Sequence, residues 1–188
     1  MKFSLSFSHV GFYVKSMKTM VNFYTSFLGF VVSDFGQRAV GGEIYFLTRD
    51  PSEHHQLVFA SGRPDNLSFN MINQLSFRVD SLATLRLLYS GLQSYSMKEI
   101  HPVTHGNALS VYFHDPENNR IELLIDTPWY VPQPHRVPVD LSLADDDLWL
   151  MIEQGVKKLP GFMSQSDWLM QMKVKIAAAD KHRLTNSI

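Results

Sequence analysis

Cysteine, a charge excess of either sign and long apolar runs are all missing from this 188-residue sequence. Without cysteine the chain has no disulfide, thiolate nucleophile or cysteine zinc site, and we expect a cytoplasmic protein. The formal net charge is -1 and lysine and arginine form no dense cluster, which argues against a nucleic-acid partner. No apolar run approaches the length of a membrane span, so no membrane partner is expected either. A small-molecule substrate fits this composition best.

The sequence is rich in apolar residues, and one stretch concentrates polar groups among them. Hydrophobic residues make up 45% of the chain, enough for one globular domain or two small fused repeats. Within residues 103 to 124, the segment 109–114 alternates apolar and polar residues, so Tyr112 lies on the polar face of a predicted strand. A turn at 115–119 follows, and Glu122 interrupts the next apolar strand. A carboxylate buried there is costly unless it is paired or binds a metal.

The order of predicted elements occurs twice. A strand at 7–14, a helix capped by Ser16 and strands at 30–35, 43–48 and 55–60 form the order βαβββ. A shift of 65 residues superposes the sequence on itself. The matching pairs are Phe12 with Phe77, Val14 with Val79, Ser16 with Ser81, Thr19 with Thr84, Tyr24 with Tyr89, Asp50 with Asp115 and Pro51 with Pro116. The sequence therefore predicts two tandem βαβββ units, residues 5–61 and 70–128.

Tandem βαβββ units with a histidine near the first strand and a glutamate in the last resemble the vicinal oxygen chelate superfamily. That superfamily includes glyoxalases, extradiol dioxygenases and antibiotic-resistance proteins. The resemblance implies an α+β domain over residues 1–128, in which the two units form a cup-shaped mixed sheet that binds a divalent metal. The hairpin is most similar to small type I extradiol ring-cleavage dioxygenases, through Val103, His105, Val111, Tyr112, Asp115, Pro116 and Glu122.

The resemblance also implies a set of site residues. The metal positions correspond to His9, Gln74 and Glu122, with Gln56 as a fourth. Gln74 stands where the dioxygenases have a second histidine, and its side-chain oxygen can still bind a divalent ion. Fe(II) is the favoured metal, with Zn, Ni or Mn as alternatives. The expected catalytic residues are His105, as an acid or base, and Tyr112, as a hydrogen-bond donor to a catecholate oxygen.

Three functions remain open at this point. The first is a metal-dependent extradiol-type dioxygenase acting on a catechol-like aromatic. The second is a glyoxalase-like lyase or isomerase that acts on a hydroxy-carbonyl substrate with a redox-silent metal. The third is a small-molecule-binding protein of the same fold without catalysis. A homodimer is expected in each case.

The candidate residues also have structural interpretations. Glu122 would form a salt bridge with Arg78 or Arg120, Gln74 would be an ordinary hydrogen-bonding residue, and Tyr112 would pack against its neighbours. His55 would restore the missing imidazole, although strand parity places Gln56 and not His55 on the polar face. His54 and His55 read more simply as a solvated surface pair.

Residues 129–188 are predicted to form a proline-rich arm and a helical extension. Four prolines between residues 127 and 138 indicate an extended segment, called the arm below, which Trp129 and Tyr130 anchor. Ser142 is predicted to cap a first helix and a second helix is expected at 166–179. The methionines Met170 and Met172 are expected to pack.

Overall fold

The computed structural model describes residues 5–67, 69–95, 97 and 99–186, with side chains as far as Lys181. The first repeat contains β1 (Val10–Val14), α1 (Met17–Ser26), β2 (Val31–Gln37), β3 (Glu43–Thr48) and β4 (Leu57–Ser61). The second contains β5 (Leu75–Arg78), α2 (Leu82–Ser94), β6 (His101–Thr104), β7 (Ala108–His114) and β8 (Arg120–Asp126). The element order confirms the predicted duplication of βαβββ.

Beyond the repeats the chain forms β9 (Trp129–Tyr130), β10 (Val137–Pro138), α3 (Asp145–Val156), β11 (Met163–Ser164) and α4 (Gln165–Asn186). One sheet has the order β1-β4-β3-β2, with β1 parallel to β4 and the other pairs antiparallel. The second has the order β10-β6-β7-β8-β5, so β5 lies beside β8 as β1 lies beside β4. The mixed strands and the four helices confirm the α+β class.

Both repeat helices begin as the sequence predicts. The Ser16 and Ser81 side chains accept hydrogen bonds from the backbone N–H of Thr19 and Thr84, which satisfies one free donor at each helix start. The two helices therefore begin with the same local signal, Ser-x-x-Thr, four residues long, in each copy of the repeat.

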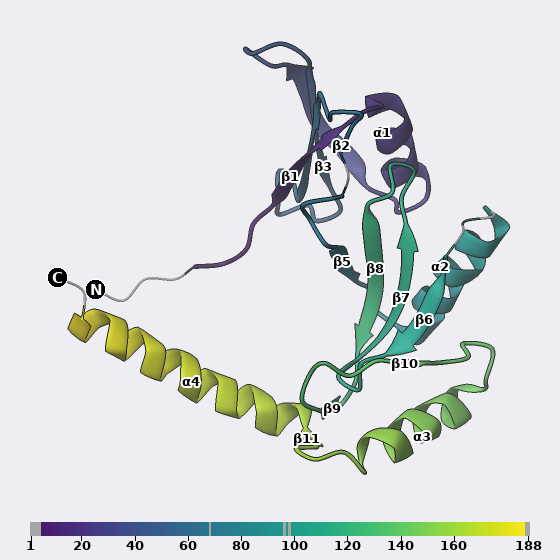
Figure 1. Cartoon of the computed structure of the whole chain (residues 1–188), viewed down its shortest axis with the longest axis vertical. Helices are drawn as coiled ribbons and strands as arrows, with labels where there is room; N and C mark the ends of the chain where they lie inside the picture. The colour runs from purple at the N-terminus through teal and green to yellow at the C-terminus, as the bar shows by residue number, and fades with distance from the viewer. Residues whose placement is uncertain (1–4, 68, 96, 98, 187–188) are drawn as a thin grey trace. The chain divides into compact units, whose positions relative to one another are not determined.

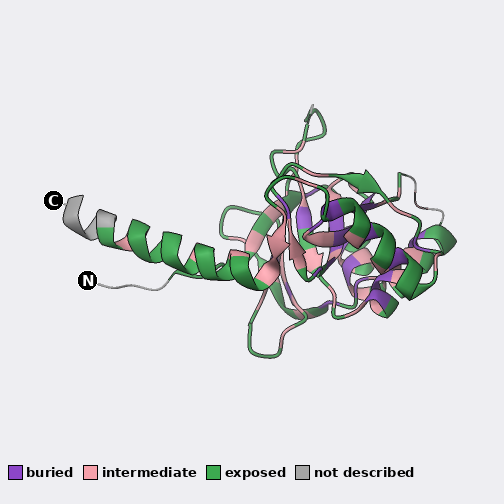
Figure 2. Cartoon of the chain, turned by 90° about the horizontal axis from the view of Figure 1, so that it is seen from below, coloured by how far each residue is buried: buried purple, intermediate pink, exposed green. Residues whose placement is uncertain are grey.

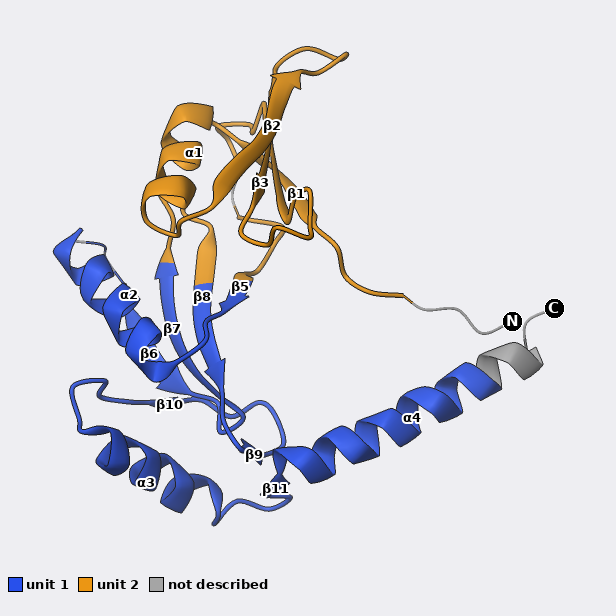
Figure 3. Cartoon of the chain, turned by 180° about the vertical axis from the view of Figure 1, so that it is seen from behind, with its two compact units in different colours: residues 1–4, 76–113, 122–188 blue, residues 5–75, 114–121 orange. Residues whose placement is uncertain are grey.

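The chain divides into two compact units (Figure 3). Unit 2 consists of residues 5–75 and 114–121, which are the first repeat and the tip of the β7-β8 hairpin. Unit 1 consists, among the described residues, of 76–113 and 122–186, which are most of the second repeat, the arm and the C-terminal helices. The domain boundary at residue 128 stays a prediction.

Each unit has its own apolar core. In unit 2 the core includes Tyr24 and Phe59, whose rings meet edge to face with centroids 5.0 Å apart. In unit 1 the inward face of β7 buries Leu109 and Val111, and α2 lies along the sheet (Figure 1). One face of the hairpin therefore packs in the core, as the apolar alternation of residues 109–114 predicts.

The C-terminal elements show one confirmed expectation and two errors. Trp129 contacts Trp149 and Tyr130 stacks on Trp168, which confirms that these residues anchor the arm. The predicted cap of α3 is wrong, because the Ser142 hydroxyl bonds Asp140 and the helix begins after Ala144 without a side-chain cap. The predicted packing of Met170 is wrong too, since its side chain is 64% exposed on α4, which is exposed along most of its length (Figure 2).

None of the helices that the structure describes is both long and apolar enough to cross a bilayer.

Candidate functional site

A chain of hydrogen bonds in unit 1 joins the two predicted catalytic residues to the predicted carboxylate ligand. Nε2 of His105 lies 2.9 Å from the Tyr112 hydroxyl, which donates to Oε1 of Glu122 at 2.6 Å. Tyr112 and Glu122 are each 5% exposed, and His105 is partly buried. The structure therefore brings together His105, Tyr112 and Glu122, three residues that the sequence picked out separately.

Strand geometry places the chain of hydrogen bonds. Tyr112 and Glu122 extend from adjacent strands, β7 and β8, and His105 comes from the turn between β6 and β7. That turn depends on Gly106, which has φ +77° and lies so close to Val131 that a Cβ atom would meet its side chain at 2.4 Å. The tight turn at Gly106 thus places the His105 imidazole next to the Tyr112 hydroxyl.

The His105 ring has one proton position that geometry assigns. Nδ1 of His105 lies 2.7 Å from the carbonyl oxygen of His135, which only accepts, so Nδ1 carries a proton. The other ring nitrogen, Nε2, faces the Tyr112 hydroxyl, and that hydroxyl donates its proton to Glu122.

Ser76 completes the surroundings of the carboxylate. Its hydroxyl donates to Oε2 of Glu122 at 2.5 Å, from β5 beside β8. Arg78 forms its ion pair with Asp126, which is exposed at the end of β8. Hydroxyl groups thus hold both oxygens of Glu122, and such contacts orient a carboxylate.

The arm contributes three groups that sequence reasoning missed. The His135 carbonyl fixes the His105 ring, and the Gln133 side chain donates to the His105 carbonyl oxygen at 2.8 Å. The Arg136 guanidinium lies over the Tyr112 ring, 5.1 Å from its centroid. No periodicity marks these residues in a proline-rich segment. Ser76 could have been predicted, because it lies two residues after Gln74 and alternate residues of a strand point to the same face.

Unit 2 holds the other predicted ligands. His9 lies just before β1, and its ring is 4.3 Å from the ring of His55, centroid to centroid. Partial burial lowers the pKa of His55, and the neighbouring His9 and His54 lower it further. The Gln56 side-chain oxygen accepts the Arg49 backbone N–H at 2.8 Å. Strand parity does not apply to His55 and Gln56, because β4 begins only at Leu57.

Gln74 precedes β5 directly and belongs to unit 2. Across the described part of the chain, no three His, Cys, Asp or Glu side chains are grouped so as to hold a metal ion. A set made of His9, Gln56, Gln74 and Glu122 relies on two amide oxygens, which are weaker ligands than carboxylates or imidazoles. Its role in metal binding stays a prediction.

The turn at the tip of the hairpin is a buried polar cluster in unit 2. Asp115 accepts hydrogen bonds from two backbone N–H groups, from the Asn119 side chain and from the Tyr24 hydroxyl. Burial raises the pKa of Asp115, and the hydrogen bonds from Asn119 oppose that rise. Asn118 has φ +64°, a left-handed geometry that asparagine tolerates better than most residues. Asp115 and Pro116 therefore shape the turn and are not part of the hydrogen-bonded series at Glu122.

Comparison with known proteins agrees with the fold. Residues 6–123 match the model of the Glyoxalase/Bleomycin resistance protein/Dioxygenase superfamily. The match covers more than half of the chain, and the protein belongs to this superfamily. The arm and the C-terminal helices lie beyond the matched residues.

One curated relative and several solved structures refine this result. Biphenyl-2,3-diol 1,2-dioxygenase 2 of Rhodococcus globerulus is 28% identical over 125 residues, which are 64% of this chain and 62% of the relative. A glyoxylase/bleomycin resistance protein/dioxygenase domain from Frankia sp. EAN1pec is 21% identical, with a TM-score of 0.57 over 66% of this chain and 94% of that one. The fosfomycin resistance protein FosX of Listeria monocytogenes, solved with Mn(II) and sulfate, is 19% identical, with a TM-score of 0.51 over 68% and 95%. The solved structures support the fold alone.

Proposed function

We propose that this protein is a metal-dependent, extradiol-type dioxygenase that acts on a catechol-like aromatic. The observation that carries the proposal is the hydrogen-bonded series His105, Tyr112 and Glu122, in which an acid or base group and a phenol adjoin a buried carboxylate. The similarity to a biphenyl-diol dioxygenase supports the same reaction class.

The side chains have distinct roles in this proposal. Glu122, with its oxygens held by Ser76 and Tyr112, fits a metal ligand, and His9, Gln74 and Gln56 are proposed as the others. When bound, Fe(II) would supply a Lewis acid for the two diol oxygens and the electrons for O₂ chemistry.

Proton transfer falls to His105. The His135 carbonyl orients the imidazole so that its Nε2 atom faces the Tyr112 hydroxyl. Nε2 takes a proton from a substrate hydroxyl and returns it later, and the Tyr112 hydroxyl donates a hydrogen bond to the substrate oxygen. The proposal extends to a cytoplasmic homodimer, which sedimentation analysis and cell fractionation test.

The test is metal analysis of protein purified without oxygen, followed by oxygen uptake with 2,3-dihydroxybiphenyl. The variants are His9→Ala, Glu122→Gln and, as a matched control, Asp126→Asn, because Asp126 is an exposed carboxylate on the same strand. We expect near-stoichiometric iron and oxygen uptake in the wild type and the control, and the loss of both in His9→Ala and Glu122→Gln.

A second candidate function follows from Gln74. An amide oxygen in place of an imidazole favours a harder ion such as Mn²⁺, and a FosX structure of this fold contains Mn(II). Bound Mn, Zn or Ni without oxygen uptake would therefore replace the dioxygenase by a glyoxalase-like lyase or isomerase. A protein that binds the diol but no metal in any variant would be a binding protein of the same fold.

A further inference from the structure

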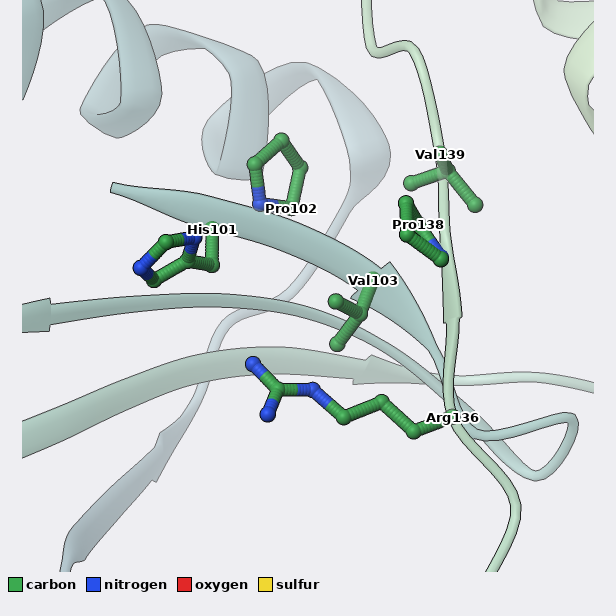
Figure 4. A pocket seen from close by; sticks show the side chains of 6 residues that line it. All are labelled: His101, Pro102, Val103, Arg136, Pro138 and Val139. Carbon is green, nitrogen blue, oxygen red and sulfur yellow. The ribbon is translucent and has the colours of Figure 1, made fainter. Parts of the chain in front are cut away.

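A pocket of about 410 Å³ opens in unit 1 along β6 (Figure 4). Its walls are the β6 residues His101, Pro102 and Val103 and, from the arm and the residue after it, Arg136, Pro138 and Val139. Four of the six are apolar, two carry nitrogen groups and none is acidic. The pocket therefore combines a hydrophobic wall with basic hydrogen-bond donors.

The Arg136 guanidinium is held in place without an acidic partner. It lies over the ring of Tyr112, and its side chain extends beneath Val103 toward His101 (Figure 4). Throughout the described residues, no hydrogen bond or ion pair joins Arg136 to another protein group. A guanidinium has five N–H donors in a planar fork that matches a carboxylate. Stacking on a ring that is 5% exposed orients this fork and leaves its donors for a ligand.

The pocket adjoins the proposed reaction site through β6 and β7. His101 is the direct cross-strand partner of Tyr112, and Val103 is the partner of Ser110, so these side chains share one face of the sheet. The Tyr112 ring thus has the proton-transfer residue His105 at its hydroxyl and Arg136 over its face. A substrate whose diol reaches the hydroxyl would direct its opposite end into the pocket.

We propose that Arg136 binds an acid group of the substrate in this pocket, so that the protein prefers aromatic diols that carry a carboxylate. The inference rests on the proposed function and names its substrate class. A carboxylate would accept two parallel hydrogen bonds from the guanidinium, and Val103 and its cross-strand partner Pro138 would contact the aromatic ring. His101 supplies a further donor at the pocket wall.

The test is isothermal titration calorimetry without oxygen, with 3,4-dihydroxybenzoate and 4-methylcatechol as probes. The two molecules differ only by a carboxylate in place of a methyl group. The variants are Arg136→Gln, Arg136→Lys and the control Lys157→Gln, which removes a charge from an exposed ion pair just beyond α3. We expect the wild type and the control to bind the acid about tenfold more tightly than the methyl compound. This is the gain in affinity expected from one hydrogen-bonded pair of charged groups. Arg136→Gln should lose this preference and Arg136→Lys should keep part of it.

Several outcomes overturn the inference. Equal affinity for the two probes in the wild type would do so, as would a preference for the acid that survives in Arg136→Gln. A folded Arg136→Gln that loses affinity for both probes alike would show a structural role instead. Oxygen uptake separates the two proposals: turnover of 4-methylcatechol as efficient as that of the acid keeps the dioxygenase and rejects the acid pocket. An acid preference that depends on Arg136 without any turnover keeps the pocket and rejects the dioxygenase.

Discussion

Replacing Tyr112 by phenylalanine tests whether the hydroxyl joins His105 to Glu122. The ring is 5% exposed and stays in place beneath Arg136, so the substitution removes only one oxygen. That oxygen lies 2.6 Å from Glu122 and 2.9 Å from His105. A hydrogen bond to a charged group stabilises a fold by about 1.5–3 kcal/mol and a neutral one by about 0.5–1.5 kcal/mol. Because both contacts share one oxygen, we expect a total loss of about 2–3 kcal/mol.

For a chain of this length, 1 kcal/mol shifts the midpoint of thermal unfolding by about 2–4 °C. Tyr112→Phe should therefore lower the melting temperature by about 4–12 °C in differential scanning calorimetry. Tyr130→Phe is the matched control, because the Tyr130 ring is half-buried and stacks on Trp168. Within the described residues, the Tyr130 hydroxyl makes no hydrogen bond. The unfolding free energy of Tyr130→Phe should stay within about 0.5 kcal/mol of the wild type.

A double-mutant cycle with Ser76→Ala then asks whether the two hydroxyls act on the same carboxylate. Ser76 and Tyr112 donate to different oxygens of Glu122, so their effects should be coupled by about 0.5–1 kcal/mol. A Tyr112→Phe protein with the same melting temperature as the wild type would refute the hydrogen-bonded series.

Three further predictions concern single polar groups. Glu117→Ala should lower the free energy of unfolding in urea by about 3 kcal/mol, because it removes the carboxylate that pairs with the buried Arg63 guanidinium and accepts the backbone N–H groups of Lys15 and Ser16; a loss below about 1 kcal/mol would contradict this. Ser110→Ala should be neutral or stabilise by up to about 1 kcal/mol, since the buried Ser110 hydroxyl has no partner in the described structure; clear destabilisation would reveal one. Burial, and then Asp115, raises the pKa of Tyr24 well above 10.0, so the folded state keeps a proton that the unfolded chain loses. Stability should therefore fall as the pH rises above about 10 and fall less steeply in Tyr24→Phe, which urea midpoints from pH 9 to 11 measure; parallel slopes would count against the buried phenol.

Local signals were enough to predict the duplicated fold. Ser16 and Ser81 each cap a helix through a contact three residues away, and the apolar alternation of β7 reaches the core as expected. Ser142 failed as a cap because Asp140, two residues earlier, competes for its hydroxyl. Short polar side chains in loops have several nearby partners, and the sequence does not rank them.

The site was predicted in its chemistry but not in its surroundings. Strand alternation placed Tyr112 on a polar face and marked Glu122 as a carboxylate within an apolar strand, and both side chains prove to be buried. Alternation distinguishes the two faces of a strand, but it does not say what covers each of them. Here the cover is the arm, whose Arg136 lies on the Tyr112 ring. Contacts between residues so far apart in the chain leave no periodic trace in the sequence.

The same reasoning separates what the superfamily supplies from what this chain adds. The matched residues 6–123 include His105, Tyr112 and Glu122. The arm lies outside them, yet it fixes the His105 ring through the His135 carbonyl and stacks a guanidinium on Tyr112. A fold shared by many enzymes says little about the substrate of any one of them. Substrate preference in this protein is therefore best sought in the arm, where Arg136 presents the one guanidinium that lines the pocket.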